Sequence, residues 1–212
     1  MTTKQYFANK IDRSQELSFL NPSLAWSEAS TLSDFHYPWT PRTPPKTTFK
    51  ALHCSSYLYF QFLAIDPELN ALVDNNDQME VTESDRVEIF FRSDASMTPY
   101  YCLEMDFLGR RLENSAVFHR QMDFDWSWPE GLTSQARETP EGYEVIGRIS
   151  KSSLETLNLL QNNQIELGLF RGEYKQSPEK GQTTVKWISW VDPGTPQPDF
   201  HVPSAFGTLF LV

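Results

Sequence analysis

Apolar and polar residues alternate in short stretches along most of the chain, and turn-forming residues separate these stretches. In residues 86–91, for example, Val87, Ile89 and Phe91 fall on one face of an extended chain and Glu88 falls on the other. This two-residue period is typical of strands that bury one face. Eight such runs predict strands at 56–66, 85–91, 99–106, 136–139, 143–149, 165–170, 185–190 and 207–212. Eight short strands predict one all-β domain of the antiparallel β-sandwich class.

One short helix is predicted near residues 150–160. Serines at the start of this segment can cap a helix, and Leu154, Leu157 and Leu160 follow at helical spacing. The segment lies between two predicted strands, so the helix is expected to connect them.

The first 46 residues have a different character from the rest. Prolines cluster at the end of this segment, at positions 38, 41, 44 and 45. Proline cannot donate a backbone hydrogen bond and is excluded from central strands. Residues 1–46 are therefore predicted to form an irregular, Pro-rich lead-in that packs on a sandwich of residues 47–212. The sequence shows no internal repeat and no second domain.

Composition agrees with a globular domain that has one core. Hydrophobic residues make up 39% of the chain and charged residues only 22%, which argues against disorder. Aromatic residues make up 14%, and flat rings suit both pleated surfaces and the stacking of sugars. Cys54 and Cys102 lie in predicted strands and are expected to be buried as small hydrophobes.

Charge and hydropathy exclude two classes of partner. The net charge of −10, with no basic run to offset it, argues against nucleic acid. No stretch approaches the roughly 18 apolar residues of a membrane span. The N-terminus lacks the apolar core of a secretory signal, so the expected location is cytoplasmic, or exported if the chain is a trimmed mature form.

Several motifs occur in an order that matches a known family. Three of them are SDRVEIFF at 84–91, WISWVDP at 187–193 and PSAFGTL at 203–209, with EGYEV at 141–145 and LGL at 167–169 between them. Together they resemble the family 9 carbohydrate-binding modules, best known as accessory domains of xylan-degrading enzymes. The likeness covers roughly residues 47–212.

The resemblance implies a β-sandwich of jelly-roll or immunoglobulin-like type, with structural calcium in characterised members. It also implies a pocket in which two Trp rings clamp a sugar at the reducing end of a chain. Here Thr82 and Phe200 stand where those rings would be. Glu88 matches the family's acidic ligand, whereas Glu104 stands where the family has a basic one. The specificity is therefore expected to differ from that of the family.

A sugar site needs an apolar ring against the C–H face of the pyranose and polar groups for its hydroxyls. Phe200 and Glu88 are the first candidates, as the stacking ring and the hydrogen-bond acceptor. One stacked ring and a few hydrogen bonds predict a Kd of roughly micromolar to millimolar. Phe200 could instead be a core ring, and Glu88 a solvated strand residue with an arginine partner.

Further ligand-binding candidates follow from position: Glu104, His201, Trp126, Trp128, Tyr101 and Arg171. Trp126 and Trp128 would share one face of an extended chain and could replace the missing ring, or be buried. Tyr100 and Tyr101 point to opposite faces of a regular strand, so one of them can line a groove. Arg171 could bind a sugar or pair across strands.

Metal and cofactor motifs are weak. The acidic loop 74–77 carries oxygen ligands suited to calcium, but it lacks the glycine and distal glutamate of an EF-hand. No C-x-x-C, H-E-x-x-H, G-x-S-x-G or phosphate-binding glycine motif occurs. We expect that no cofactor is required, with structural calcium compatible with the family.

Two other functions compete with non-catalytic carbohydrate binding. A structural or protein-interaction sandwich is one, because the fold alone does not fix function. A glycoside hydrolase is the other, with Glu88 and Glu104 as its carboxylates, which would need a separation of about 5 to 5.5 Å or about 6.5 to 9.5 Å. The expected function is binding, not catalysis, with a carbohydrate from polysaccharide breakdown, such as a xylan fragment, as the partner.

Overall fold

Strands make up most of the computed structural model, which describes residues 4–12, 26–75, 77–176 and 183–212. The strands are β1 (Gln5–Lys10), β2 (Thr47–His53), β3 (Tyr57–Ile65), β4 (Arg86–Arg92), β5 (Tyr100–Asp106), β6 (Arg111–Val117), β7 (Gln121–Asp123), β8 (Thr133–Thr139), β9 (Gly142–Ser150), β10 (Leu160–Gln161), β11 (Gln164–Gln176), β12 (Thr183–Ser189) and β13 (Gly207–Leu211). Three short helices join them: η1 (Gln78–Glu83), α1 (Lys151–Thr156) and η2 (Pro203–Ala205). None of the described helices is long and apolar enough to cross a membrane.

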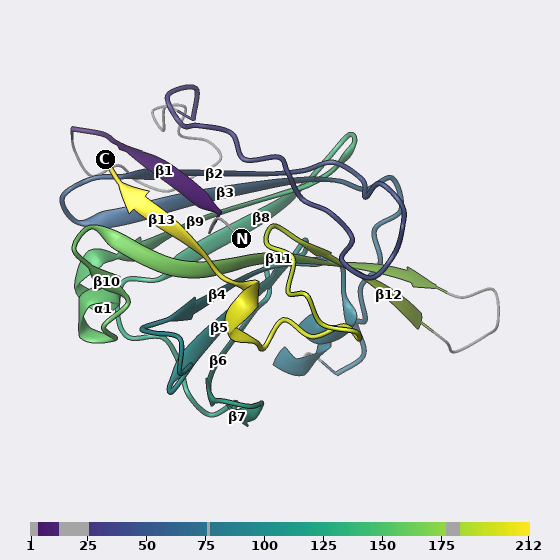
Figure 1. Ribbon diagram of the computed structural model, residues 1–212. Coiled ribbons are helices and arrows are strands. Elements are labelled where there is room, and N and C mark those ends of the chain that lie inside the picture. The colour runs from purple at the N-terminus through teal and green to yellow at the C-terminus, as the bar shows by residue number, and fades with distance from the viewer. Residues whose placement is uncertain (1–3, 13–25, 76, 177–182) are drawn as a thin grey trace.

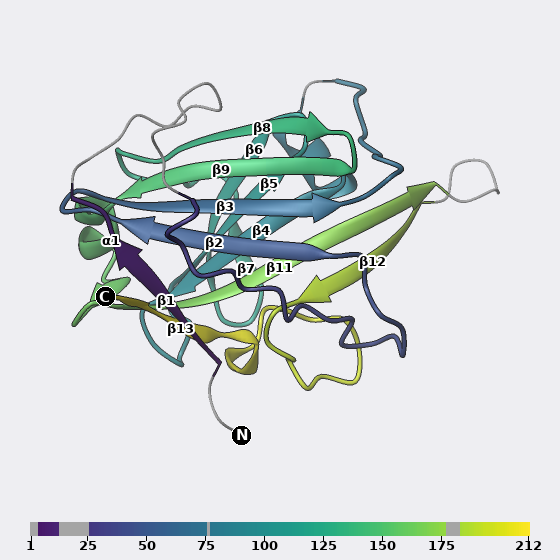
Figure 2. The ribbon, with the colours of Figure 1, turned by 90° about the horizontal axis from the view of Figure 1, so that it is seen from above.

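The strands form two layers of a β-sandwich (Figure 1). The first sheet has the order β7-β6-β5-β4-β11-β13, with β10 and β12 also paired to β11, and the second has β2-β3-β9-β8. Figure 2 shows β8, β9, β3 and β2 side by side, with β4, β5 and β6 crossing behind them. The predicted β-sandwich is confirmed.

β1 belongs to both sheets. Its first four residues pair with β13 in parallel, and Asn9 and Lys10 pair in parallel with β2. The other pairings among the described strands are antiparallel. A strand that changes sheets in this way closes one side of the sandwich.

The main core lies between the sheets. Val87 and Ile89 of β4 contribute to it from the first sheet, and Phe60 and Phe62 of β3 from the second. Because side chains alternate along a strand, Glu88 and the other even-numbered residues of β4 face outward from the first sheet. All seven residues of β4 are nonetheless buried. The outer face of this sheet is therefore covered as well.

That cover is a second apolar cluster, formed between the first sheet and the segment around η2. Its buried members are Phe90, Met97, Tyr100, Cys102, Ala116, Phe170, Phe200, Ala205 and Phe206. In Figure 1 the yellow segment between β12 and η2 follows this side of the molecule. The functional site forms under this segment.

All eight predicted strands are present, in β3, β4, β5, β8, β9, β11, β12 and β13. Cys54 and Cys102 are buried free thiols, as expected. The interpretation of 1–46 as irregular is wrong for Gln5–Lys10, which form β1 because Tyr6 and Ala8 alternate inward while Phe7 faces out. β2, β6, β7 and β10 were also not predicted.

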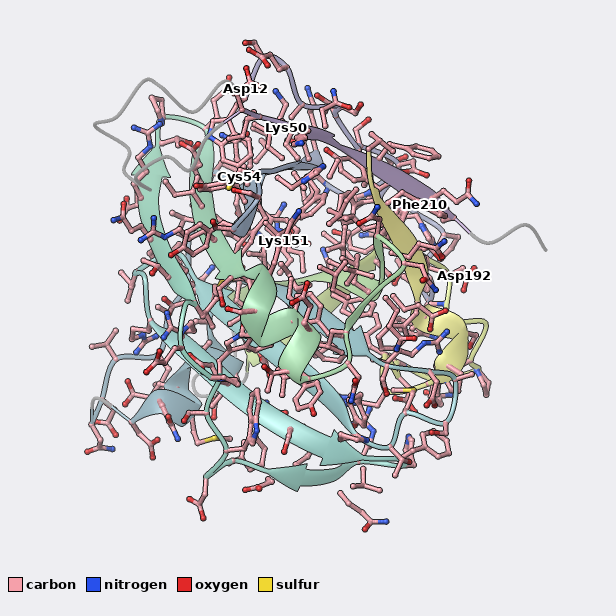
Figure 3. All side chains as sticks on the ribbon, turned by 90° about the vertical axis from the view of Figure 1, so that its left-hand side faces the viewer. Asp12, Lys50, Cys54, Lys151, Asp192 and Phe210 are labelled. Carbon is pink, nitrogen blue, oxygen red and sulfur yellow. The ribbon has the colours of Figure 1, made fainter. Side chains whose placement is uncertain are left out.

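The predicted helix is present but shorter. Ser150 caps α1, where its side chain accepts a hydrogen bond from the backbone N–H of Ser153. Leu154 is buried as expected, whereas Leu157 ends the helix and Leu160 belongs to β10. Figure 3 shows α1, with Lys151 at its start, at one end of the sandwich between the two layers.

Candidate functional site

A cavity of about 350 Å³ lies on the outer face of the first sheet. Its lining comes from β4, β5, β12, the turn between β6 and β7, and the segment between β12 and η2. The lining residues are Arg86, Glu88, Phe90, Glu104, Arg120, Trp187, Pro198, Asp199, Phe200 and His201. Charged groups and aromatic rings thus meet in one concave space.

Strand register brings the charged base of the cavity together. Glu88 on β4 lies opposite Glu104 on β5 and, on its other side, opposite Phe170 on β11. Arg86 is two residues before Glu88, so it projects from the same face. Directly opposite residues on one face of an antiparallel pair have Cβ atoms about 4.5 to 5.5 Å apart. The two carboxyl groups are therefore neighbours, with a guanidinium beside them.

One guanidinium nitrogen serves both carboxylates. Arg86 Nε lies 2.8 Å from Glu88 Oε1 and 2.7 Å from Glu104 Oε2. Neither contact has the geometry of a hydrogen bond. Among the described residues, Arg86 Nε, Glu88 Oε1 and Glu104 Oε2 have no hydrogen-bond partner. The Nε–H carries one proton for two carboxylates. The carboxylates are thus ion-paired but retain capacity to accept hydrogen bonds.

The rest of Arg86 is held in place. Its Nη1 donates to the backbone carbonyl of Thr82 at 2.8 Å. Its guanidinium lies 5.2 Å from the ring centre of Trp187 and 5.6 Å from that of Tyr174. These contacts fix the guanidinium between two aromatic faces, a favourable position for a cation.

Burial shifts the pKa values of two lining residues. Glu88 is 2% exposed, and this burial raises its pKa, as does the charge of Glu104, while Arg86 opposes the shift. His201 is also buried, which lowers its pKa to about 4. Its Nδ1 lies 2.8 Å from the Tyr100 hydroxyl. Near neutral pH His201 is therefore an uncharged hydrogen-bonding group.

The aromatic side of the cavity is formed by Phe200 and Trp187. Phe200 is 6% exposed and stacks on Phe170, with ring centres 4.0 Å apart and planes at 13°. It also meets the Trp187 ring edge-on at 5.5 Å. One face of Phe200 is thus occupied by protein, whereas Trp187 is only partly buried. Trp187 is the larger apolar surface for a ligand.

An ion-pair clasp closes the rim. Asp199, in the segment before η2, lies 2.9 Å from both His119 Nε2 and Arg120 Nη2, in the turn between β6 and β7. Asp199 Oδ1 also accepts a hydrogen bond from the backbone N–H of His201 at 2.9 Å. The clasp joins two segments 79 residues apart and holds Phe200 and His201 over the cavity.

Four of the sequence-predicted residues line this cavity: Glu88, Glu104, Phe200 and His201. The other four lie outside it. Tyr101 projects to the core side of β5, where it packs against Trp126 at 4.9 Å and Trp128 at 6.3 Å. Trp128 is buried there, and its indole donates to Ser153 Oγ. These three rings are on the opposite face of the first sheet from the cavity.

Arg171 is also outside the cavity. It is fully buried between the sheets, because its odd-numbered position on β11 faces the core. Its Nη2 lies 2.7 Å from Asp66 Oδ2, and its Nη1 donates to Thr47 Oγ1. Of the two interpretations left open for Arg171, the sugar contact is not seen, and the ion pair is made not with a neighbouring strand but with Asp66, directly after β3 of the second sheet.

Sequence reasoning missed Arg86, Phe90, Trp187, Arg120, Pro198 and Asp199 as lining residues. Arg86 and Phe90 could have been found, since they share the alternation of Glu88. Trp187 lies within one of the family motifs. Arg120 carried no sequence signal, because the clasp with Asp199 depends on two distant loops.

In the parts of the chain that the structure describes, no group of three or more His, Cys, Asp or Glu side chains could hold a metal ion. Of the acidic loop 74–77, Asn76 lies outside the described residues.

Comparisons with known proteins identify similar folds and a family. No curated protein matches the chain. A solved structure of a candidate carbohydrate-binding protein from Bacteroides uniformis ATCC 8492 is 18% identical with a TM-score of 0.76, and all of both chains is covered. Identity at this level shows a shared fold.

Two structures of a family 9 carbohydrate-binding module from Caldicellulosiruptor kristjanssonii are also similar. The complex with cellotriose is 16% identical with a TM-score of 0.64, covering 98% of this chain and 93% of that one. The complex with glucose is 17% identical with a TM-score of 0.59, covering 99% and 96%. The sequence model of the family described as "Carbohydrate family 9 binding domain-like" matches residues 23–212, so the chain belongs to that family.

Proposed function

We propose that the protein binds a mono- or oligosaccharide, without catalysis, in the cavity over β4 and β5. Family membership supports carbohydrate binding, and the similar module from Caldicellulosiruptor kristjanssonii binds cellotriose and glucose. The observation that carries the proposal is the pairing of Glu88 and Glu104 around one guanidinium, next to the partly buried ring of Trp187.

The cavity combines the two kinds of contact that a pyranose needs. Trp187 and the edge of Phe200 can pack against C–H groups, and Glu88 and Glu104 can accept hydrogen bonds from hydroxyls. Arg120 can donate hydrogen bonds at the rim. A volume of about 350 Å³ is near the lower end of small-ligand pockets, which span about 300 to 1,000 Å³. We therefore infer that one sugar unit, free or at the end of an oligosaccharide, enters the cavity.

Titration calorimetry tests this function. The screen should include glucose, xylose, cellobiose, xylo-oligosaccharides and pectic sugars, with an expected Kd of roughly micromolar to millimolar for the best ligand. Trp187→Ala should weaken binding by about two- to tenfold through the lost ring contact. Trp126→Ala is the matched control, because that tryptophan is on the other face of the sheet. Absence of binding at millimolar sugar would favour a structural or protein-interaction role.

Hydrolysis is the second function to test, because Glu88 and Glu104 approach the same nitrogen and burial raises the pKa of Glu88. A raised pKa and a close carboxylate partner are what a general acid needs. The family is nevertheless one of binding modules. We expect intact cellobiose and xylobiose after long incubation. Turnover that is lost in Glu88→Gln would overturn the binding-only proposal.

A further inference from the structure

The charges that line the cavity do not balance. Arg86 and Arg120 supply two positive groups, whereas Glu88, Glu104 and Asp199 supply three carboxyl groups. His201 adds no charge near neutral pH, because burial lowers its pKa to about 4. The carboxyl groups therefore exceed the cations by one, within a protein whose net charge is −10.

The excess is located at the base of the cavity. At the rim, Asp199 is paired with Arg120 and His119. At the base, Arg86 is shared between two carboxylates, and its side chain is about as buried as theirs. A buried carboxylate without a full partner is unfavourable, and the cost falls when a proton or a cation joins it. The base of the cavity therefore has one carboxyl group more than it has cations, and burial raises the pKa of Glu88, so either a proton or a bound cation supplies the missing positive charge.

A ligand can supply that charge. We propose, resting on the sugar-binding function above, that the cavity selects sugars by charge and prefers an ammonium-bearing pyranose to a neutral one and a neutral one to a uronic acid. An ammonium group donates three hydrogen bonds and suits the acceptor capacity of Glu88 and Glu104. The carboxylate of a uronic acid would instead add a further carboxyl group to this excess, beside Glu88 and Glu104 in a poorly solvated site.

The test compares glucosamine, glucose and glucuronate by titration calorimetry at low salt and about pH 7, where most of the amine is protonated. A charged hydrogen bond contributes about 1 kcal/mol more than a neutral one, so glucosamine should bind about fivefold more tightly than glucose. Glucuronate should bind at least about fivefold more weakly than glucose, through repulsion of similar size. Failure of either step in this ranking overturns the proposal.

A charge variant identifies the origin of the ranking. Glu104→Gln keeps the size of the side chain and makes the numbers of lining carboxyl groups and cations equal, so the advantage of glucosamine over glucose should fall below about twofold. Glu138→Gln, on the exposed face of β8, removes one charge far from the cavity and should keep the full ranking. A ranking that persists in folded Glu104→Gln would contradict the proposed origin.

The outcomes for the two proposals differ. Should Glu104→Gln fail to fold, the ranking in the unchanged protein still decides the charge proposal. Binding of glucose without the predicted ranking would overturn charge selection alone. Failure of all three sugars, and of the neutral oligosaccharides in the wider screen, would overturn sugar binding itself.

Discussion

Glu88 and Glu104 face each other across β4 and β5, and each has a carboxylate oxygen within 2.8 Å of the same Arg86 nitrogen. The pKa of Glu88 is raised although a cation lies beside it. The reason is that burial of Glu88 and the neighbouring charge of Glu104 together outweigh the shared guanidinium. This balance gives a pH-dependent effect on stability.

Because of Glu88, the free energy of unfolding should fall as the pH rises. Its pKa is raised in the folded state, so its contribution is fully present below the ordinary pKa of about 4.3. Between the ordinary pKa and the raised folded pKa, the folded state holds a proton that the unfolded state has released. Stability therefore falls as the pH rises across this window, and the contribution is lost once the pH has passed the folded pKa. Relative to the unchanged protein, Glu88→Gln should therefore gain up to about 1.4 kcal/mol per pH unit.

Denaturant unfolding between pH 5 and pH 8 measures this gain. Asp85, whose burial raises its pKa to about 6, acts in the same direction but is present in both proteins and cancels. Glu138→Gln, an exposed substitution, should give a curve parallel to that of the unchanged protein. A parallel curve for Glu88→Gln would show that the pKa of Glu88 is not raised.

The clasp at the rim should matter more for binding than for stability. Asp199→Asn removes the charge that joins His119 and Arg120 to the segment carrying Phe200. Exposed ion pairs contribute about 0 to 1 kcal/mol, so the melting temperature should change by only a few degrees. Sugar affinity should fall severalfold because the cavity loses its positioned wall.

Calorimetry of Asp199→Asn beside Asp125→Asn checks this difference, because Asp125 is an exposed residue outside the cavity. Only the first variant should bind sugar more weakly. The loss should be smaller at high salt, where the ion pairs of the clasp are already screened. Equal affinities for both variants would show that the clasp does not position the wall.

Local sequence patterns predicted the strands and their faces, whereas contacts between distant segments left no such pattern. Alternation in residues 86–91 was enough to place Glu88 on the outer face, and the family motif gave Glu104 and Phe200. The same alternation could not show that the outer face is covered, because the cover comes from the segment before η2. The exchange of β1 between sheets was missed because Gln5–Lys10 is short and lies before a proline-rich segment.

The spacing of Trp126 and Trp128 could not predict which face of the sheet they join. Their spacing correctly implies a common side of an extended chain, but spacing does not say which sheet face that side joins. Both rings pack on Tyr101, on the core side of β5. The ring that does line the cavity, Trp187, comes from β12, which extends from the sheet as a partner of β11.

Asn114 offers a test of stability on the same outer face. It lies on β6 opposite Cys102, is fully buried, and its amide has no hydrogen-bond partner among the described residues. An unsatisfied buried polar group costs about 1 to 3 kcal/mol. Asn114→Leu, of similar shape, should therefore raise the melting temperature by about 2 to 4 °C or more. Asn114→Ala, which leaves a void, should be less stable than the leucine variant.

Thermal unfolding followed by circular dichroism measures both Asn114 variants. Stabilisation by leucine would confirm that the amide is unsatisfied in the folded protein. A clear drop in melting temperature for Asn114→Leu would instead show that the amide makes a hydrogen bond in solution.

Arg171 should prove to be a structural residue. Arg171→Met removes the partner of the fully buried Asp66 and should cost about 3 to 5 kcal/mol, because a buried charge is left unpaired. Lys175 Nζ, 3.6 Å from Asp66 Oδ1, can compensate part of that loss. The double variant Asp66→Asn with Arg171→Met removes both charges and should recover much of the stability.

Guanidinium denaturation gives these free energies of unfolding, and calorimetry at a temperature where all variants are folded gives the sugar affinity. Sugar affinity should be unchanged in Arg171→Met, since the residue faces the core between the sheets, and a folded variant with weakened binding would return Arg171 to the ligand site.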